Sequence, residues 1–284
     1  MKNEELKIRK VGIIGVGFMG GSLALSLKEK FPQIFVCGYA RSKKSYDKLQ
    51  KLNILDRVER DLKKVVEDAD FVAIALPIYA IIDYFKKISP FLKKGAIVFD
   101  LGSSKESIEK NARSLPKNVS FVGCHPLCGS EKTGAEFSRS QLYKEALCLI
   151  TSSSTAPAAK IVKNLWEKLG SKVVFLPPSL HDKILSSVSH LPHIISFSLA
   201  FLIPKDYVKF SSSSLKDITR VASSPPFIWA EIFLSNKKNI LSDIAGFIKV
   251  LESFQKVIKE EDKKKIVSLI EKINIKQKLL NGKG

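Results

Sequence analysis

A glycine-rich turn after the first apolar run is the feature that most constrains the fold of this chain. The run Val11–Val16 overlaps the sequence GVGFMG at residues 15–20, and a helix-like stretch, Ser22–Lys28, follows it. In the spacing G-x-G-x-x-G, the first glycine permits a tight turn, the second lets the backbone approach a pyrophosphate, and the third lets the helix pack on the strand. The unpaired N–H groups at the helix start attract phosphate. Between a strand and a helix, this motif predicts dinucleotide binding, and a glycine turn without a ligand is the alternative.

The first 177 residues alternate short apolar runs with amphipathic, helix-like stretches. The apolar runs are Val11–Val16, Ile34–Tyr39, Phe71–Leu76, Ala96–Leu101, Val119–Cys124, Ala146–Thr151 and Lys172–Leu176. Strands that are buried on both faces and separated by helices predict an α/β fold with a doubly wound, mainly parallel sheet. Only helix-like segments follow Pro177 and Pro178. We therefore predict a dinucleotide-binding Rossmann domain over residues 1–177 and an all-helical domain over residues 178–284.

Composition and charge narrow the classes of function. The chain has 45% hydrophobic and 26% charged residues, which is typical of a globular protein. We find no apolar stretch near the roughly 18 residues of a membrane span, so no membrane association is expected. The net charge is +19, but lysines are spread along the chain without interleaved stacking aromatics, which argues against a nucleic-acid partner. Four cysteines among 284 residues fit a reducing cytoplasm better than a disulfide scaffold.

The residues after the second apolar run bear on the choice of cofactor. An Asp or Glu usually ends this strand and binds the ribose hydroxyls of NAD, but this chain has Ala40, Arg41 and Ser42 there. A guanidinium and a hydroxyl suit a 2′-phosphate, which predicts NADP, with NAD as the alternative and a solvated Arg41 as the other interpretation. The cofactor contacts that we expect are Gly15, Gly17, Phe18, Met19, Gly20, Arg41, Ser42, Leu76 and Pro77.

Polar side chains at two later strand ends and in the helical part are candidates for catalysis. Ser103 follows the run Ala96–Leu101 and His125 follows Val119–Cys124, so both fall where open α/β sheets bind ligands. A histidine near its reference pKa can accept a proton at neutral pH, and a guanidinium such as that of Arg220 suits a carboxylate. The spacing C-H-x-x-C at residues 124–128 does not match common zinc sites, so no metal is expected.

In their order along the chain, these motifs resemble those of the prephenate/arogenate dehydrogenase family. They are GVGFMG (15–20), GSSK (102–105), GCHPLCGSE (123–131), SHLPH (189–193), DITR (217–220) and FIW (227–229). The resemblance covers nearly the whole chain and implies a Rossmann domain followed by a helical domain through which two chains form a homodimer. It also implies an NAD(P)-dependent oxidative decarboxylation of prephenate or arogenate in tyrosine biosynthesis. Hydride leaves the carbinol carbon, and carbon dioxide leaves as the ring aromatises.

The resemblance also implies roles for individual residues. His125 accepts the hydrogen bond of the ring hydroxyl, and Ser103 hydrogen-bonds His125 or that hydroxyl. The expected substrate-binding residues are His193, Arg220, Gly129 and Ser130. Trp229 is interpreted as a helix-packing residue of the core, and His190 as orienting or structural.

Other functions remain open on the sequence alone. A β-hydroxyacid dehydrogenase shares the glycine motif and would use a lysine in the first helix after the Rossmann domain, where Lys183 stands. A non-catalytic NADP-binding redox sensor is the second alternative. Arogenate carries an ammonium group that needs a carboxylate partner, for which Glu136 is a candidate. Because Lys132 stands between Glu131 and Glu136, we expect prephenate as substrate, with arogenate as a possible second one.

Overall fold

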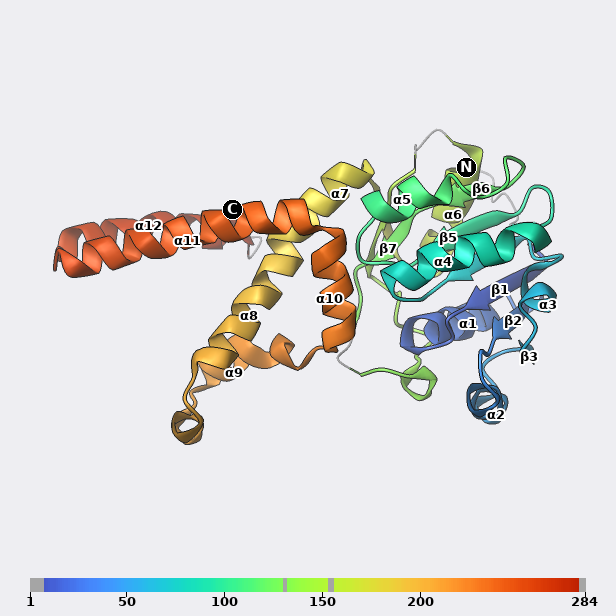
Figure 1. The fold of residues 1–284 in the computed structure, drawn as a ribbon, viewed down its shortest axis with the longest axis horizontal. Helices are drawn as coiled ribbons and strands as arrows, with labels where there is room; N and C mark the ends of the chain where they lie inside the picture. Colours follow the sequence, from blue (N-terminus) through green and yellow to red (C-terminus); the bar gives the residue numbers. More distant parts are fainter. Residues whose placement is uncertain (1–7, 130–131, 153–155, 281–284) are drawn as a thin grey trace. The chain divides into compact units, whose positions relative to one another are not determined.

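Six parallel strands form the main sheet of the computed structural model, which describes residues 8–129, 132–152 and 156–280 (Figure 1). The strands are β1 (Lys10–Ile14), β2 (Phe35–Tyr39), β3 (Arg57–Glu59), β4 (Phe71–Ile74), β5 (Ile97–Asp100) and β6 (Ser120–Val122). Their order is β3-β2-β1-β4-β5-β6, so the direction of winding reverses between β1 and β4. Open α/β sheets bind dinucleotides at this reversal. The predicted α/β fold class is confirmed.

Helices cover both faces of this sheet because its strands are apolar on both sides. The helices of this part are α1 (Phe18–Lys30), α2 (Lys43–Leu52), α3 (Leu62–Val66), α4 (Ile78–Ile88), α5 (Glu106–Ala112) and α6 (Pro157–Lys168). Ile13 of β1 belongs to a core with Leu23 of α1 and Trp166 of α6. Ile14, the next residue, belongs to a second core with Ile81 of α4. Alternate residues of one strand therefore hold helices on opposite faces.

The expectation of one sheet through all the apolar runs is wrong for the last part of this region. A second sheet has the order β7-β8-β9 and consists of β7 (Cys124–Pro126), β8 (Leu147–Ile150) and β9 (Lys172–Phe175). The run Val119–Cys124 divides between the two sheets at Gly123, where a side-chain carbon would meet Thr151 Oγ1 at 2.3 Å. His125 therefore lies inside β7, which pairs antiparallel with β8, rather than after a strand end.

Two elements of the main sheet region differ from the pattern-based expectation. Strand β3 was not predicted, because it has three residues and only Val58 is buried. Helix α1 begins at Phe18 instead of Ser22. Gly20 and Gly21 lie in its first turns and have low helix propensity, which hides the start of the helix from a propensity pattern.

The region after β9 is helical, as expected. Its elements are α7 (Pro178–Leu185), a π-helical turn (Ser186–His190), α8 (Leu191–Leu202), the 3₁₀ turn η4 (Lys205–Phe210), α9 (Ser213–Thr219), the 3₁₀ turn η5 (Arg220–Ser223) and α10 (Pro226–Ser235). The first three are continuous, and this segment of 25 residues, Pro178–Leu202, is long and apolar enough by length and composition to cross a membrane. The expectation that no stretch reaches that length is therefore wrong. The segment also contains His181, Asp182 and His190, which are buried inside the protein.

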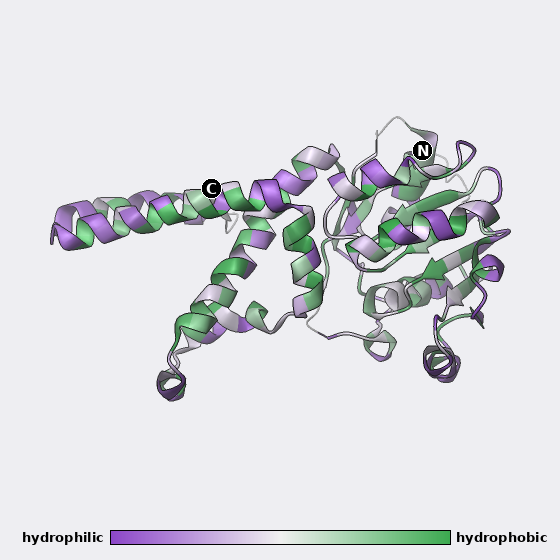
Figure 2. Ribbon diagram, viewed as in Figure 1, coloured by the Kyte–Doolittle hydropathy of each residue, from purple (hydrophilic) through white to green (hydrophobic). Residues whose placement is uncertain are grey.

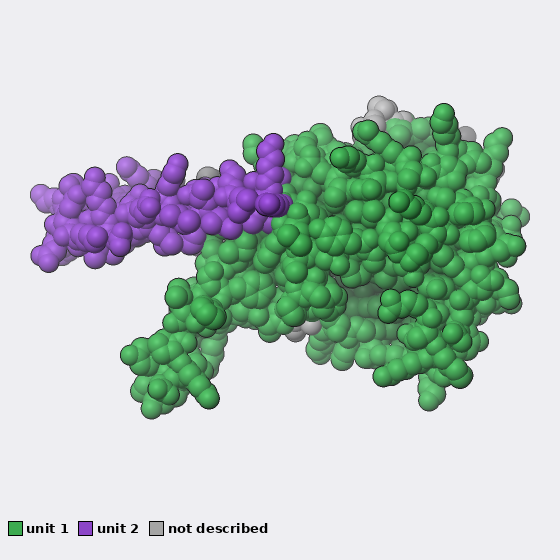
Figure 3. All heavy atoms as spheres, in the orientation of Figure 1, with its two compact units in different colours: residues 1–236 green, residues 237–284 purple. Residues whose placement is uncertain are grey.

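The chain divides into two compact units, residues 1–236 and 237–284 (Figure 3). Within the first unit the last strand ends at Phe175, and the all-helical region begins at Pro178. The division into domains at residue 177 stays a prediction. The second unit consists of α11 (Lys237–Lys259) and α12 (Lys263–Leu280), which pack on each other as a hairpin. Apolar residues run along both helices of this hairpin (Figure 2), and several remain exposed, including Leu251 and Ile258.

Candidate active site

The glycine turn between β1 and α1 has the geometry of a phosphate cradle. Gly15 has a φ of 94°, and a side-chain carbon there would meet the Ala75 carbonyl oxygen at 2.3 Å. A side chain at Gly20 would meet the Gly15 carbonyl oxygen at 2.2 Å, whereas one at Gly17 would meet nothing within 4 Å. The first and third glycines thus serve close packing, and the second leaves open space beside the start of α1. This arrangement fits a dinucleotide pyrophosphate at the helix N-terminus.

The other residues predicted to contact the cofactor surround this turn. Leu76 lies within 2.8 Å of the position that a Gly15 side chain would occupy, and Pro77 precedes the first residue of α4. Arg41 is exposed after β2 and forms no ion pair with the described residues. The Ser42 hydroxyl accepts the Ser45 N–H at 3.1 Å and caps α2, a role that the sequence analysis did not assign to it.

A cavity of about 600 Å³ lies beside the glycine turn, within the first compact unit. It reaches from the start of α1 to the helical segment, and its lining includes Phe18, Met19, Ser103, His125, Gly129, Lys132, His190, His193, Arg220 and Trp229. The structure therefore brings together residues that lie far apart in the sequence. Ser130, also predicted to bind substrate, lies outside the described residues. A volume of this size is typical of a small-molecule site.

His125 is the first member of a buried chain of hydrogen bonds. Its Nδ1 lies 2.9 Å from Nε2 of His181, and Nδ1 of His181 lies 2.8 Å from Oδ1 of Asp182. A carboxylate accepts only, so the His181 Nδ1 must carry a proton and its Nε2, when His181 is neutral, must accept one from His125. That assignment leaves Nε2 of a neutral His125 as a lone-pair acceptor. These hydrogen bonds thus leave Nε2 of His125 able to accept a proton.

The pKa values of His125, His181 and His193 are all lowered, which favours the neutral form. Burial, together with repulsion from His181 and Lys105, holds the pKa of His125 well below its ordinary value of 6.5. Burial also lowers the pKa of His181, although Asp182 opposes this shift. The pKa of His193 is lowered by burial, and the charge of Arg220 adds to that effect. At neutral pH, His125 is therefore ready to accept a proton.

The backbone around His125 is fixed by a buried ion pair that the sequence analysis did not identify as part of the site. Lys105 and Asp100 are fully buried, and their side chains pair with each other. Lys105 Nζ also donates to the Cys124 carbonyl at 2.8 Å, and Asp100 Oδ1 accepts the Cys124 N–H at 3.3 Å. The backbone N–H of Lys105 donates to Asp182 at 2.7 Å. One network therefore holds β5, α5, β7 and α7 around the base.

The sequence signal for this network is the adjacent pair His181 and Asp182 on α7, a histidine directly beside a carboxylate. Lys105 belongs to the motif GSSK and occupies the position before α5. Asp100, His181 and Asp182 carried no predicted role. Such a network cannot be recognised from spacing, because its members lie on four elements that only the fold brings together.

Ser103 and Arg220 approach the same cavity from different elements. Ser103 follows β5 and lines the cavity, and among the described residues it forms no hydrogen bond with His125. Arg220, at the start of η5, forms no ion pair with any described residue, although it lines a cavity with many apolar side chains. A guanidinium placed there without a counterion favours a ligand that carries a carboxylate.

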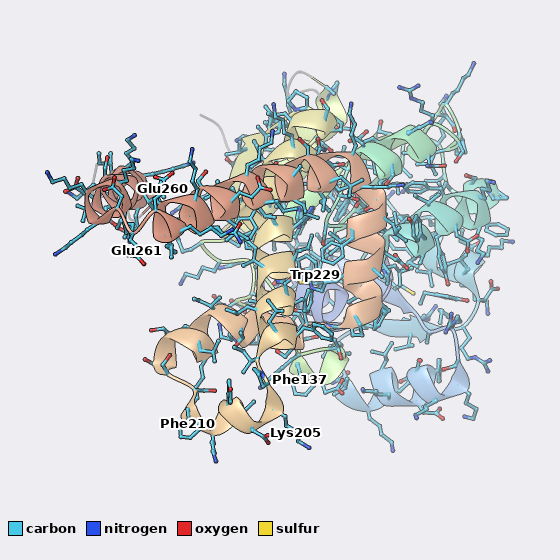
Figure 4. The ribbon with its side chains drawn as sticks, turned by 60° about the vertical axis from the view of Figure 1, so that its left-hand side comes forward. Phe137, Lys205, Phe210, Trp229, Glu260 and Glu261 are labelled. Carbon is cyan, nitrogen blue, oxygen red and sulfur yellow. The ribbon has the colours of Figure 1, made fainter. Side chains whose placement is uncertain are left out.

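Trp229 packs against Phe197 and Phe233 and against the core, as predicted, and it also lines the cavity. Its ring stacks on His193 with 3.6 Å between centroids and 24° between planes, and it lines the cavity between α8 and α10 (Figure 4). Nδ1 of His193 lies 2.9 Å from the Ser189 carbonyl, so the ring orientation is fixed on two sides. This leaves Nε2 of His193 as the nitrogen available to a ligand. His190 is buried beside Asn236, in keeping with a structural role.

Two residues considered in the sequence analysis are not brought to the cavity. Glu136 forms an ion pair with Lys48 at 2.7 Å and does not line the cavity, so it is not placed to pair with an ammonium group there. Lys183 is exposed on α7 and is also absent from the lining. The lysine that a β-hydroxyacid dehydrogenase would require is therefore not at this site.

Comparison with protein families identifies both parts of the chain. Residues 23–175 match the nucleotide-binding domain of prephenate dehydrogenase, and residues 177–272 match the prephenate dehydrogenase dimerization domain. The cyclohexadienyl dehydrogenase of Zymomonas mobilis is 30% identical over 263 residues, which cover 89% of this chain and 90% of that protein. The prephenate dehydrogenase of Lactococcus lactis is 31% identical over 274 residues, covering 93% and 75% respectively.

Solved structures lead to the same family. The prephenate dehydrogenase of Aquifex aeolicus, in complex with hydroxyphenyl propionate and NAD+, has a TM-score of 0.89 and 33% identity, and the match covers 98% of this chain and 100% of that one. The arogenate dehydrogenase of Synechocystis has a TM-score of 0.80 and 25% identity, with 95% and 99% covered. Together with the glycine cradle and the histidine cavity, these matches establish that the chain belongs to the prephenate/arogenate dehydrogenase family.

Proposed function

We propose that this protein catalyses the NAD(P)-dependent oxidative decarboxylation of prephenate to 4-hydroxyphenylpyruvate in tyrosine biosynthesis. The observation that carries the proposal is the hydrogen-bonded chain from Asp182 through His181 to His125, because His125 lines the same cavity as Arg220. A base and a carboxylate-binding cation in one cavity are the two groups that the reaction requires from the protein. The relatives named above act in this chemistry, which supports the assignment.

His125 acts as the base in the proposed mechanism. Its Nε2 accepts the proton of the ring hydroxyl as hydride leaves the same carbon and the ring carboxylate leaves as carbon dioxide. The bound nicotinamide supplies the hydride acceptor. Asp182 stabilises the imidazolium that forms, acting through His181, and Lys105 keeps the backbone of β7 in place. Ser103 is proposed to hydrogen-bond the substrate hydroxyl.

Charge in the cavity supports prephenate as the preferred substrate. Lys132 and Arg220 line it, and no Asp or Glu does so among the described residues. Prephenate carries two carboxylates and no ammonium, whereas the ammonium of arogenate would be buried here beside cations. We place Arg220 on one carboxylate and His193, stacked on Trp229, against the ring or its side chain.

NADP is the proposed cofactor, with NAD as the alternative. The exposed Arg41 after β2 is free of ion pairs with the described residues, and Ala40 replaces the carboxylate that would bind the ribose hydroxyls of NAD. We also propose a homodimer in the cytoplasm. The match to a dimerization domain and the exposed apolar residues of α11 and α12, such as Leu251 and Ile258, support the dimer. The four cysteines, all free thiols, suit a reducing compartment.

The test is an assay of the purified protein with prephenate, arogenate and a small β-hydroxyacid, each with NAD+ and NADP+. Formation of reduced nicotinamide is followed by absorbance. We expect turnover with prephenate and the higher kcat/KM with NADP+. Turnover of the β-hydroxyacid alone would contradict the proposal, and cofactor binding without turnover of any substrate would indicate a redox sensor.

A further inference from the structure

Residues 135–143, which follow the loop that contains Gly129, pack against the first turns of helix α1. The 3₁₀ turn η2 (Ala135–Phe137) packs on α1, and Phe137 marks this turn in Figure 4. The Tyr143 hydroxyl donates to the Met19 carbonyl at 2.7 Å. The backbone N–H of Arg139 donates to Ser22 Oγ at 3.0 Å. These bonds fix the segment against the end of α1 that faces the cofactor.

Close packing brings the two segments into direct contact at a glycine. A side-chain carbon at Gly21 would meet Ser138 Oγ at 2.2 Å. Ser138 Oγ itself lies 3.4 Å from the Gly17 carbonyl oxygen. Arg139, the next residue, is therefore held near the glycine turn by its neighbour Ser138 and by its own backbone N–H.

Arg139 places a positive charge beside the first residue of α1, with its guanidinium over an aromatic ring. Its guanidinium carbon lies 5.7 Å from the ring centroid of Phe18, the first residue of α1. The N-terminus of a helix is the positive end of its dipole, and the first turn of α1 contains no acidic residue. Arg139 is exposed and forms no ion pair with the described residues. An anion bound at the start of α1 would therefore meet both the positive end of the helix dipole and the guanidinium.

We propose that Arg139 binds the pyrophosphate of the nicotinamide cofactor, as a side-chain donor that adds to the backbone N–H groups of the glycine turn. The guanidinium offers a planar pair of donors that suits phosphate oxygens. NAD+ and NADP+ share the pyrophosphate, so this role does not depend on which of them is the natural cofactor. The role differs from that of Arg41, which is proposed to read the 2′-phosphate carried by NADP+ alone.

The test compares Arg139→Gln with wild type by calorimetric titration of NAD+ and of NADP+ in the absence of substrate. Lys144→Gln is the matched control, because Lys144 is an exposed cation on the same segment that does not contact the glycine turn. We expect the Kd of Arg139→Gln to rise about tenfold for both cofactors, since a charge-assisted bond is lost. The control should stay within twofold of wild type.

Further readouts separate a phosphate contact from a structural effect. Thermal unfolding of Arg139→Gln without ligand should match that of wild type, and Arg139→Lys should recover part of the affinity. The KM of Arg139→Gln for prephenate should differ from that of wild type by less than twofold. An unchanged Kd for both cofactors would overturn the assignment, as would a loss confined to NADP+, which would place the guanidinium on the 2′-phosphate. Because no substrate is present in the titration, a wrong choice of substrate leaves this test unaffected.

Discussion

The glycine turn and the histidine cavity lie side by side but are built in opposite ways. The turn consists of six consecutive residues, 15–20, whose backbone forms the cradle. The cavity gathers side chains from β7, α7, α8, η5 and α10. Backbone N–H groups act on a phosphate at any ordinary pH, whereas the cavity depends on the protonation of buried imidazoles. Substitutions around the turn should therefore change cofactor affinity, and substitutions in the cavity should change the chemical step.

The largest effect is expected for His125→Asn. Asparagine keeps a similar size but cannot take the proton of the ring hydroxyl, so kcat should fall by about two to four orders of magnitude. The Kd for the cofactor, measured by titration without substrate, should change little because His125 is not part of the glycine cradle. A variant that keeps the wild-type kcat would remove this histidine from the mechanism.

For Arg220→Ala, we expect a loss of about 2–4 kcal/mol in kcat/KM, mainly as a higher KM for prephenate. The guanidinium is proposed to bind a carboxylate in the ground state and the transition state alike, so kcat should fall less than KM rises. Steady-state kinetics measure the two parameters. An unchanged KM would show that another cation, for instance Lys132, binds the carboxylate.

A smaller effect is expected for Asp182→Asn, which tests the chain behind His125. An amide at this position no longer provides the negative charge that favours a proton on His181 and stabilises the imidazolium. Loss of such an outer partner of a functional histidine should lower kcat by about ten- to a hundredfold. Cofactor affinity should be unchanged. If kcat is also unchanged, Asp182 serves only to hold Lys105 and Glu106 of α5 in place.

The glycine turn could be predicted from the sequence, but the network that the fold assembles around His125 could not. The glycine turn is contiguous, and its spacing follows from backbone geometry, so the sequence was enough to place it. His125, His193 and Arg220 were found because each lies in a recognisable motif, and the structure brings them to one cavity. Their roles as catalytic and substrate-binding residues stay predictions.

The parts that could not be predicted depend on contacts between distant elements. Nothing near Lys105 in the sequence indicates that its charge is buried against Asp100 and bonded to Cys124. At Gly123, where the run divides between the two sheets, a side-chain carbon would collide with Thr151, which lies 28 residues further along the chain. Likewise, Glu136 was considered for the substrate site by its closeness in sequence to His125, whereas its actual partner is Lys48 of α2.

The cofactor preference can be changed by substitutions near the glycine turn that leave the histidine cavity unaltered. Replacing Ala40 by Asp and Arg41 by Gln adds a partner for the ribose hydroxyls and repels the 2′-phosphate. We expect the preference for NADP+ over NAD+ to reverse, while kcat with the preferred cofactor stays near the wild-type value. Comparing kcat/KM for both cofactors measures it. Wild-type enzyme that already prefers NAD+ would show that Arg41 is a solvated loop residue.

The smallest expected effect is the pH dependence that separates the two sites. His125 must be neutral to accept a proton, so kcat/KM should rise with pH through the pKa of this residue and stay constant above it. Burial and the nearby positive charges lower that pKa, which places the acid limb of the profile below 6.5. The Kd for NAD+ should stay flat over the same range, because its cradle is made of backbone groups and the pyrophosphate keeps its charge.

His193 also has a lowered pKa, so the profile of His193→Asn is the control, and its acid limb should remain. A limb at or above 6.5, or one that disappears in this variant, would assign the titration to a group other than His125.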